Sequence, residues 1–223
     1  MRRMPFRGWP SEAITFYEGL EADNSKTYFA AHKDVYESAV VAPFRALSDE
    51  IADTFGPLHL FRPYRDVRFS KDKSPYKTAQ GAVTESEGGA IYYVALSSAG
   101  LFAGSGYYRP APDQLVRLRE GIDDPKAGPA LERAVAAARK AGYEVGGEAL
   151  KTAPKGYAKD HPRIELLRMK GLTVGKSFPP AKWIQTAKAK DRIVEAWHAS
   201  DAVNAWLAKH VGPSTAPPEE SWG

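Results

Sequence analysis

The expected fold is decided by residues 80–108, QGAVTESEGGAIYYVALSSAGLFAGSGYY. This stretch contains three apolar runs typical of β-strands, at 80–85, 91–98 and 101–108, and glycine-bearing turns separate them. The connections are too short for parallel crossovers, so the pattern predicts an antiparallel meander. Two further strands are expected just before it, at 58–64 and 67–70.

Helical periodicity flanks these strands on both sides. Apolar side chains at helical spacing predict three helices before residue 56, the second of which begins at Asn24 or Ser25. After Pro112 the pattern predicts helices near 115–122, 131–138 and 163–170, a strand at 172–178 and two closing helices. We therefore expect an α+β fold, with an antiparallel sheet of about five to six strands and helices packed against it.

The 223 residues suit one core, so we expect a single α+β domain over residues 1–211 and a flexible tail over 212–223. The chain has no cysteine, which excludes disulfides and thiolate chemistry. The basic start is not followed by an apolar run, and no run of about 18 apolar residues is present. These features predict a cytoplasmic protein with no membrane partner.

The positive charge is concentrated in one segment, residues 62–77. The segment carries two acidic residues, Asp66 and Asp72, against six basic ones: Arg62, Arg65, Arg68, Lys71, Lys73 and Lys77. Its excess equals the formal net charge of the whole chain, +4. A neutral body with one cationic segment favours a local anion site over a broad electrostatic surface.

Strand alternation predicts how this segment is oriented. One set of side chains would face the core: Arg65, Val67 and Phe69. The other set would share the opposite face: Asp66, Arg68 and Ser70. Asp66 and Arg68 are then placed to pair with each other or to meet one ligand, whereas Arg65 would need a partner or an open strand end.

These residue types indicate an anion site, because guanidinium groups match phosphate and carboxylate oxygens in pairs. The expected ligand-binding residues are Arg62, Arg65, Arg68, Lys73, Lys77 and Lys151. The expected catalytic residues are Tyr76, His161 and Asp66. Asp66 would orient a guanidinium group, and the two lysines beside Tyr76 would favour its phenolate. The alternative is a salt-bridged strand followed by a solvated basic loop.

Lys151 and His161 belong to a second basic cluster, residues 148–170. We expect this cluster to fold over residues 62–77, which would make His161 the nearby side chain that titrates near neutrality. The equally weighted alternative is that Asp160 or His161 caps the helix beginning at Arg163. Neither the histidine spacing nor the acidic residues indicate a metal site, and no cofactor motif is present.

The sequence resembles a family of uncharacterised bacterial proteins filed as domain of unknown function 2461. The pattern Arg-x-x-Arg-Asp-x-Arg-Phe-x-x-Asp-Lys-x-x-Tyr-Lys begins here at Arg62 and ends at Lys77. Two further regions are similar to the family's motifs, one from Asn24 to Tyr36 and one from Gly147 to Pro162. Tyr28 stands where a tryptophan is expected. The resemblance implies no particular activity, but it favours a role for the cationic segment beyond a solvated loop.

Three functions remain open at this point. The first is binding of a small phosphorylated or otherwise anionic molecule, with or without catalysis. The second is nucleic-acid binding, in which Tyr64, Phe69 and Tyr76 would stack on bases. The third is a non-catalytic interaction or scaffold protein, in which the motif is a structural ion-pair network. The sequence indicates neither a reaction nor an oligomeric state.

Overall fold

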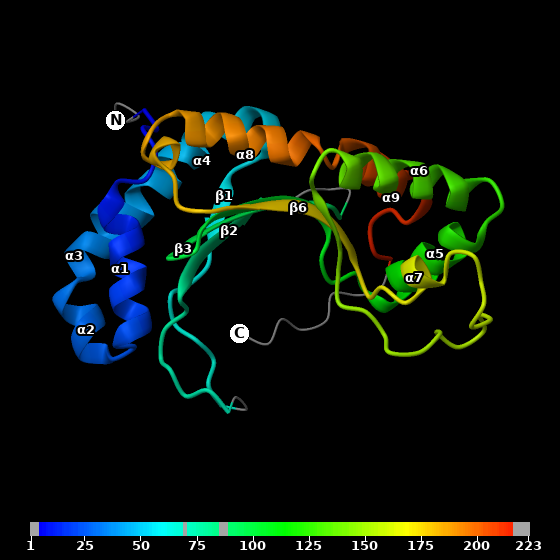
Figure 1. Ribbon diagram of the computed structural model, residues 1–223, viewed down its shortest axis with the longest axis horizontal. Helices are drawn as coiled ribbons and strands as arrows, with labels where there is room; N and C mark the ends of the chain where they lie inside the picture. Colours follow the sequence, from blue (N-terminus) through cyan, green and yellow to red (C-terminus); the bar gives the residue numbers. More distant parts are fainter. Residues whose placement is uncertain (1–4, 69–70, 85–88, 216–223) are drawn as a thin grey trace. The chain divides into compact units, whose positions relative to one another are not determined.

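A computed structural model describes residues 5–68, 71–84 and 89–215, and it has the expected α+β fold (Figure 1). Its strands form one six-stranded antiparallel sheet in the order β1-β2-β3-β4-β6-β5. The strands are β1 (Leu58–Leu60), β2 (Ala79–Thr84), β3 (Ile91–Ser97), β4 (Gly100–Tyr107), β5 (Glu144–Gly146) and β6 (Leu172–Phe178).

Two expectations about the strands are wrong. Val67 and Arg68 are not in a strand, because the chain has already left the ladder that follows β1; Phe69 and Ser70, which complete the expected strand, lie outside the described residues. Strand β5 was not expected, because three residues are too few to show an alternating pattern. It forms by pairing with β6, and Val145 lies opposite Val174.

The chain divides into two compact units, which are described separately. Unit 1 comprises Met1–Glu85, Tyr92–Ala103 and Ser177–Glu195, and unit 2 comprises Ser86–Ile91, Gly104–Lys176 and Ala196–Gly223. Strands β3, β4 and β6 and the helix at Lys188–His198 have residues in both units. The single domain expected over residues 1–211 stays a prediction.

Unit 1 begins with α1 (Ser11–Ala22), α2 (Lys26–Ala31), α3 (Lys33–Val35), the π-helix η1 (Tyr36–Val41) and α4 (Ala42–Phe55). The Ser25 hydroxyl caps α2 by accepting the Tyr28 amide at 3.1 Å, as the sequence predicted. The second expected helix, which begins at Ser25, is not continuous. It is interrupted at His32, and the chain then continues through α3 and the π-helical turn η1.

One face of the unit 1 strands is covered by helices. Helix α4 packs against β1 (Figure 1). Helix α8 (Lys188–His198) is joined to α4 by the 2.6 Å ion pair between Lys190 and Glu50. A short 3-10 helix, η2 (Lys182–Gln185), precedes α8. Strand side chains that face these helices are buried, among them Ala82, Val94, Leu96 and Leu101.

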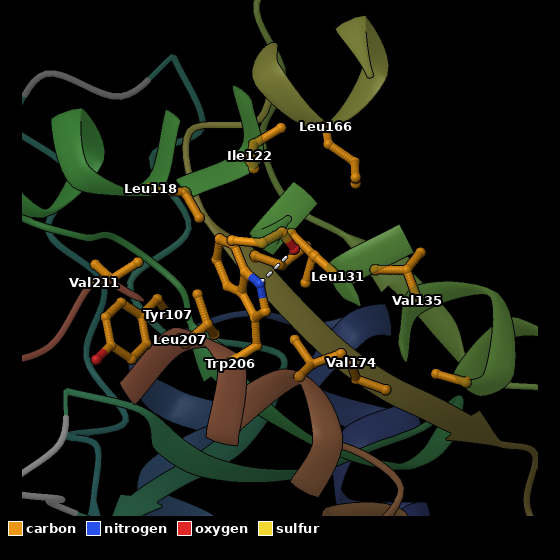
Figure 2. Packing of buried hydrophobic residues seen from close by; sticks show 14 of the residues in the cluster. Tyr107, Leu118, Ile122, Leu131, Val135, Leu166, Val174, Trp206, Leu207 and Val211 are labelled. Atoms are coloured by element: carbon orange, nitrogen blue, oxygen red, sulfur yellow. Dashed lines mark hydrogen bonds between the residues drawn. The ribbon is translucent and has the colours of Figure 1, made fainter. Parts of the chain in front are cut away.

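Unit 2 contains α5 (Pro112–Asp123), α6 (Ala127–Lys140), α7 (Ile164–Leu167) and α9 (Asp201–His210), whose apolar faces share one core. Figure 2 shows Trp206 of α9 pointing into that core toward Leu131 and Leu118. The indole nitrogen of Trp206 donates to the Ala127 carbonyl at 2.9 Å, so the buried polar atom is satisfied (Figure 2).

Helix α5 also holds the start of the segment that we expected to be a flexible tail. The Arg117 guanidinium donates to the Pro213 carbonyl at 2.8 Å, and the Asp113 carboxylate accepts the Ser214 hydroxyl at 2.8 Å. Residues 216–223 lie outside the described part of the chain. Among the described residues, no helix is both long and apolar enough to span a membrane.

Candidate functional site

The described parts of the segment between β1 and β2, residues 62–68 and 71–77, project from these strands as the two arms of a hairpin, here named the cationic hairpin (Figure 1). At its base Tyr64 forms an isolated antiparallel bridge with Tyr76. Two backbone hydrogen bonds, of 2.9 and 2.8 Å, flank this bridge. The base of the hairpin is therefore an extension of the sheet, although no strand was expected at Tyr76.

The base is held to the N-terminal helices by one side-chain amide. Asn24 donates from Nδ2 to the Tyr76 carbonyl and accepts the Tyr76 amide at Oδ1, each at 3.1 Å. In this way Asn24 imitates a neighbouring strand. The Tyr76 ring also stacks on Phe29 of α2, with 4.1 Å between centroids and 4° between planes.

Tyr76 does not have the environment expected of a catalytic phenolate. Its side chain is only 5% exposed, and desolvation by burial raises its pKa, with a further rise from Tyr64. The expectation from the sequence is the opposite, namely that the neighbouring lysines lower the pKa of Tyr76. The correction has a simple physical reason: the ring points toward Phe29 on the helix-facing side of the hairpin, so burial dominates.

The outer part of the hairpin contains two ion pairs. The Arg68 guanidinium donates hydrogen bonds to the Asp66 carboxylate from Nη2 at 2.8 Å and from Nε at 3.1 Å. The Arg68 backbone amide donates to the same carboxylate at 3.1 Å. Hydrogen bonds from Arg68 lower the pKa of Asp66 to about 2. The predicted pairing of Asp66 with Arg68 is therefore confirmed, and the Asp66 carboxylate accepts its hydrogen bonds from Arg68.

Arg65 forms the second ion pair, with Asp72. Asp72 also accepts the Ser74 hydroxyl and amide, and these hydrogen bonds are the main reason why its pKa is lowered. The expectation that Arg65 faces the core is wrong. Its neighbour Tyr64 packs against Tyr76, so Arg65 points to the opposite side and finds an exposed partner.

Three further cations belong to the expected ligand-binding set. Arg62 is exposed at the base of the hairpin. Lys73 is exposed, and its ammonium group donates to the Val67 carbonyl at 2.9 Å, which holds the outer loop together. Lys77 lies over the Phe61 ring, with 5.4 Å between Nζ and the ring centroid. The two carboxylates of the segment, Asp66 and Asp72, are paired with Arg68 and Arg65. The remaining basic side chains therefore account for the excess positive charge of the segment.

His161 and Lys151 belong to unit 2, whereas the cationic hairpin belongs to unit 1. His161 Nδ1 accepts the Arg163 amide at 3.0 Å, so Nε2 carries the proton and donates to Asp123 Oδ1 at 2.9 Å. His161 thus bonds the amide of Arg163, the residue that precedes α7, and the capping alternative stays a prediction. Lys151 is exposed, and its carbonyl accepts Arg168 at 2.8 Å. The expected convergence of the two clusters stays a prediction.

Sequence reasoning missed two features of this region. The sequence marks Asn24 by its place before a helix and as the start of a family-like motif, but a contact across 52 residues leaves no local signal of its partner Tyr76. The pattern puts Phe61 in a strand, yet its ring is 42% exposed beside Lys77. An aromatic residue directly before a basic run was the available signal for Phe61. Among the described residues, no three His, Asp or Glu side chains lie close enough together to hold a metal ion.

Comparison with known proteins places the chain in a family. The family model described as "Conserved hypothetical protein (DUF2461)" matches residues 12–206, so the chain belongs to this family. The matched range includes the cationic hairpin and most of both compact units. None of the curated proteins searched matches this sequence.

Proposed function

We propose that the cationic hairpin binds phosphate-bearing anionic ligands. The observation that carries this proposal is its charge balance on an exposed projection: six basic residues stand against two carboxylates, and each carboxylate is paired with one arginine. Exposed groups of one sign raise the local concentration of counter-ions. A phosphate-bearing ligand would supply the negative charge that the segment lacks.

We assign the main contacts to Arg62, Lys73 and Lys77. Arg65 and Arg68 would contribute from within their ion pairs, with Asp66 and Asp72 fixing the orientation of the guanidinium groups. Because the hairpin projects into solvent, the ligand would bind to its surface. A contribution from Lys151 and a cytoplasmic location are kept as predictions from the sequence.

We propose binding without a catalytic step. Tyr76 is buried and its pKa is raised, so the phenol stays protonated near neutral pH. Both ring nitrogens of His161 are engaged, one by Asp123 and one by the Arg163 amide. These contacts favour structural roles for both residues.

The test is calorimetric titration with tripolyphosphate, together with thermal unfolding in its presence. We expect saturable binding that stabilises the protein and weakens as salt is added. The triple variant Arg62→Gln, Lys73→Gln, Lys77→Gln should bind about tenfold more weakly, because each lost contact between exposed charges contributes a fraction of a kcal/mol to about 1 kcal/mol.

A charge-matched control is available in unit 2, where Lys126, Arg133 and Lys140 are also exposed. Changing these three residues to glutamine should leave tripolyphosphate binding as in the wild type. If both triple variants lost the same amount of tripolyphosphate affinity, the loss would follow from net charge alone, and a local site would be refuted. Absence of binding, combined with lower stability of Arg65→Gln, would instead favour a structural ion-pair network.

A further inference from the structure

The unit 1 strands have a second face, opposite the helices. In the register of β2 with β3, Ala82 lies opposite Val94, and both are fully buried on the helix side. Gly81 and Tyr93 are their neighbours along each strand, so they point to the other face. Phe102 lies between the buried Leu101 and Ala103 of β4 and is partly exposed, which puts it on this second face as well.

Three aromatic rings form a row on this second face, here named the aromatic row: Phe61, Tyr93 and Phe102. The ring centroids of Phe61 and Tyr93 are 6.2 Å apart, and those of Tyr93 and Phe102 are 5.8 Å apart. Phe61 is tied to the sheet by its amide, which donates to the Gly81 carbonyl at 2.9 Å. The row therefore crosses adjacent strands as one surface.

Gly81 makes the row possible. A Cβ atom at this position would lie 2.8 Å from Tyr93 Oη and 3.0 Å from Phe61 Cδ2, so both rings would have to shift. Glycine in a strand weakens the strand and often marks a place where another group approaches the backbone. Here it lets two rings lie over β2, which an alanine would push aside.

The aromatic row is partly exposed to solvent. Phe61 is 42% exposed, and Tyr93 and Phe102 are partly exposed. A single exposed aromatic residue is ordinary, but contiguous rings on a sheet face mark an interaction surface. The four-stranded sheet of the RNA-recognition motif presents aromatic side chains in a similar way and stacks two or three bases of single-stranded RNA on them.

The charges beside the row identify what would bind there. Lys77 stands at the Phe61 end of the row, 5.4 Å from the ring centroid, and belongs to the cationic hairpin. Arg65 is on the same side of the hairpin, because it alternates with Tyr64, which packs against Tyr76. Exposed rings directly beside excess cations complement a ligand that carries both planar bases and phosphates.

We propose that unit 1 binds single-stranded nucleic acid, with bases stacked on the aromatic row and phosphates on the cationic hairpin. This inference rests on the proposed function and specifies its ligand. Duplexes do not fit equally well, because their bases are already stacked on one another. The base stacking expected of Tyr76 is reassigned to the row, since the Tyr76 ring is stacked on Phe29.

The test is fluorescence anisotropy with labelled oligothymidylate and oligouridylate strands and a mixed-sequence duplex, at fixed salt. We expect tighter binding of a single strand than of the duplex or of tripolyphosphate. Phe61→Ala should weaken single-strand binding by about five- to 150-fold, the range expected when one stacking ring is removed. The same variant should bind tripolyphosphate as the wild type does.

Three control variants test whether a loss of affinity in Phe61→Ala is due to the missing aromatic ring at this position. Phe61→Tyr should keep single-strand affinity, and Phe61→Leu should lose it although the side chain stays apolar. Tyr108→Ala should have no effect: Tyr108 is 61% exposed but belongs to unit 2. Because Phe61 is exposed, we expect all of these variants to unfold at nearly the wild-type temperature.

The outcomes separate the two proposals. If tripolyphosphate binding depends on Arg62, Lys73 and Lys77 but Phe61→Ala and Phe61→Leu leave oligonucleotide affinity unchanged, the stacking inference is wrong and the proposed function stands. Equal affinity for duplex and single strand also refutes the inference. If the triple charge variant binds tripolyphosphate like the wild type, the proposed function is refuted and the inference fails with it. The ribose and deoxyribose strands distinguish RNA from DNA.

Discussion

Arg68 in the cationic hairpin and Arg163 at the start of α7 have the same side chain and different surroundings. The Arg68 side chain is 66% exposed, and its contacts are to a neighbouring carboxylate. The Arg163 side chain is 12% exposed and donates to the Ile122 carbonyl at 2.6 Å and the Asp123 carbonyl at 2.9 Å. Positive charge in the sequence therefore does not by itself identify a binding residue; exposure and the type of partner do.

The largest effect that follows from this comparison is on stability. Arg163→Ala should lower the free energy of unfolding by about 3 kcal/mol, because two carbonyls lose charged donors in a mostly buried position. Urea unfolding measures the change. Arg68→Ala is the matched control, and its cost should be much smaller, because the Arg68–Asp66 ion pair is exposed to solvent. Equal costs for the two variants would remove the distinction between the two regions.

Arg163→Lys sharpens the same comparison. A lysine keeps the charge but lacks the planar fork that reaches two carbonyls at once. We expect it to recover less than half of the lost stability. Full recovery would mean that charge, and not geometry, is what unit 2 needs at this position.

A smaller effect is expected where the cationic hairpin meets the N-terminal helices. Asn24→Ala should cost about 2 kcal/mol, because the amide and carbonyl of Tyr76 both lose their partner. Asn24→Asp keeps an acceptor but not a donor, so its cost should be intermediate. Hydrogen exchange of the Tyr76 amide is the local readout. Unchanged protection in Asn24→Ala would show that the stacking on Phe29 alone holds the hairpin.

The smallest effect concerns the protonation of Asp66. Its pKa is lowered to about 2 in the folded protein, below the ordinary value of about 4. A lowered pKa stabilises the fold above the ordinary value, and this contribution is lost as the pH falls through about 2. Carboxyl NMR titration should give this low pKa, and Arg68→Ala should raise it toward about 4. Arg192→Ala, at another exposed ion pair, should leave it unmoved.

Local chemistry was enough to predict much of the molecule from its sequence. The Ser25 cap, most helical stripes and most alternating strands depend on neighbours a few residues away, and these appear where expected; the strand expected at 67–70 and the uninterrupted second helix do not. The pairing of Asp66 with Arg68 is equally local, because two residues of separation bring the groups together. Segment charge is a property of composition, so the amino-acid sequence alone locates the cationic hairpin.

Only the tertiary structure decided which side chains of that region face solvent. The raised pKa of Tyr76 comes from burial against Phe29, and the Tyr76 backbone is held by two hydrogen bonds from Asn24. Both partners lie far from Tyr76 in sequence. The aromatic row exists because sheet pairing brings Tyr93 of β3, Phe102 of β4 and Phe61, which directly follows β1, to one face. Register and burial depend on contacts between distant residues, and these contacts form only when the whole chain packs.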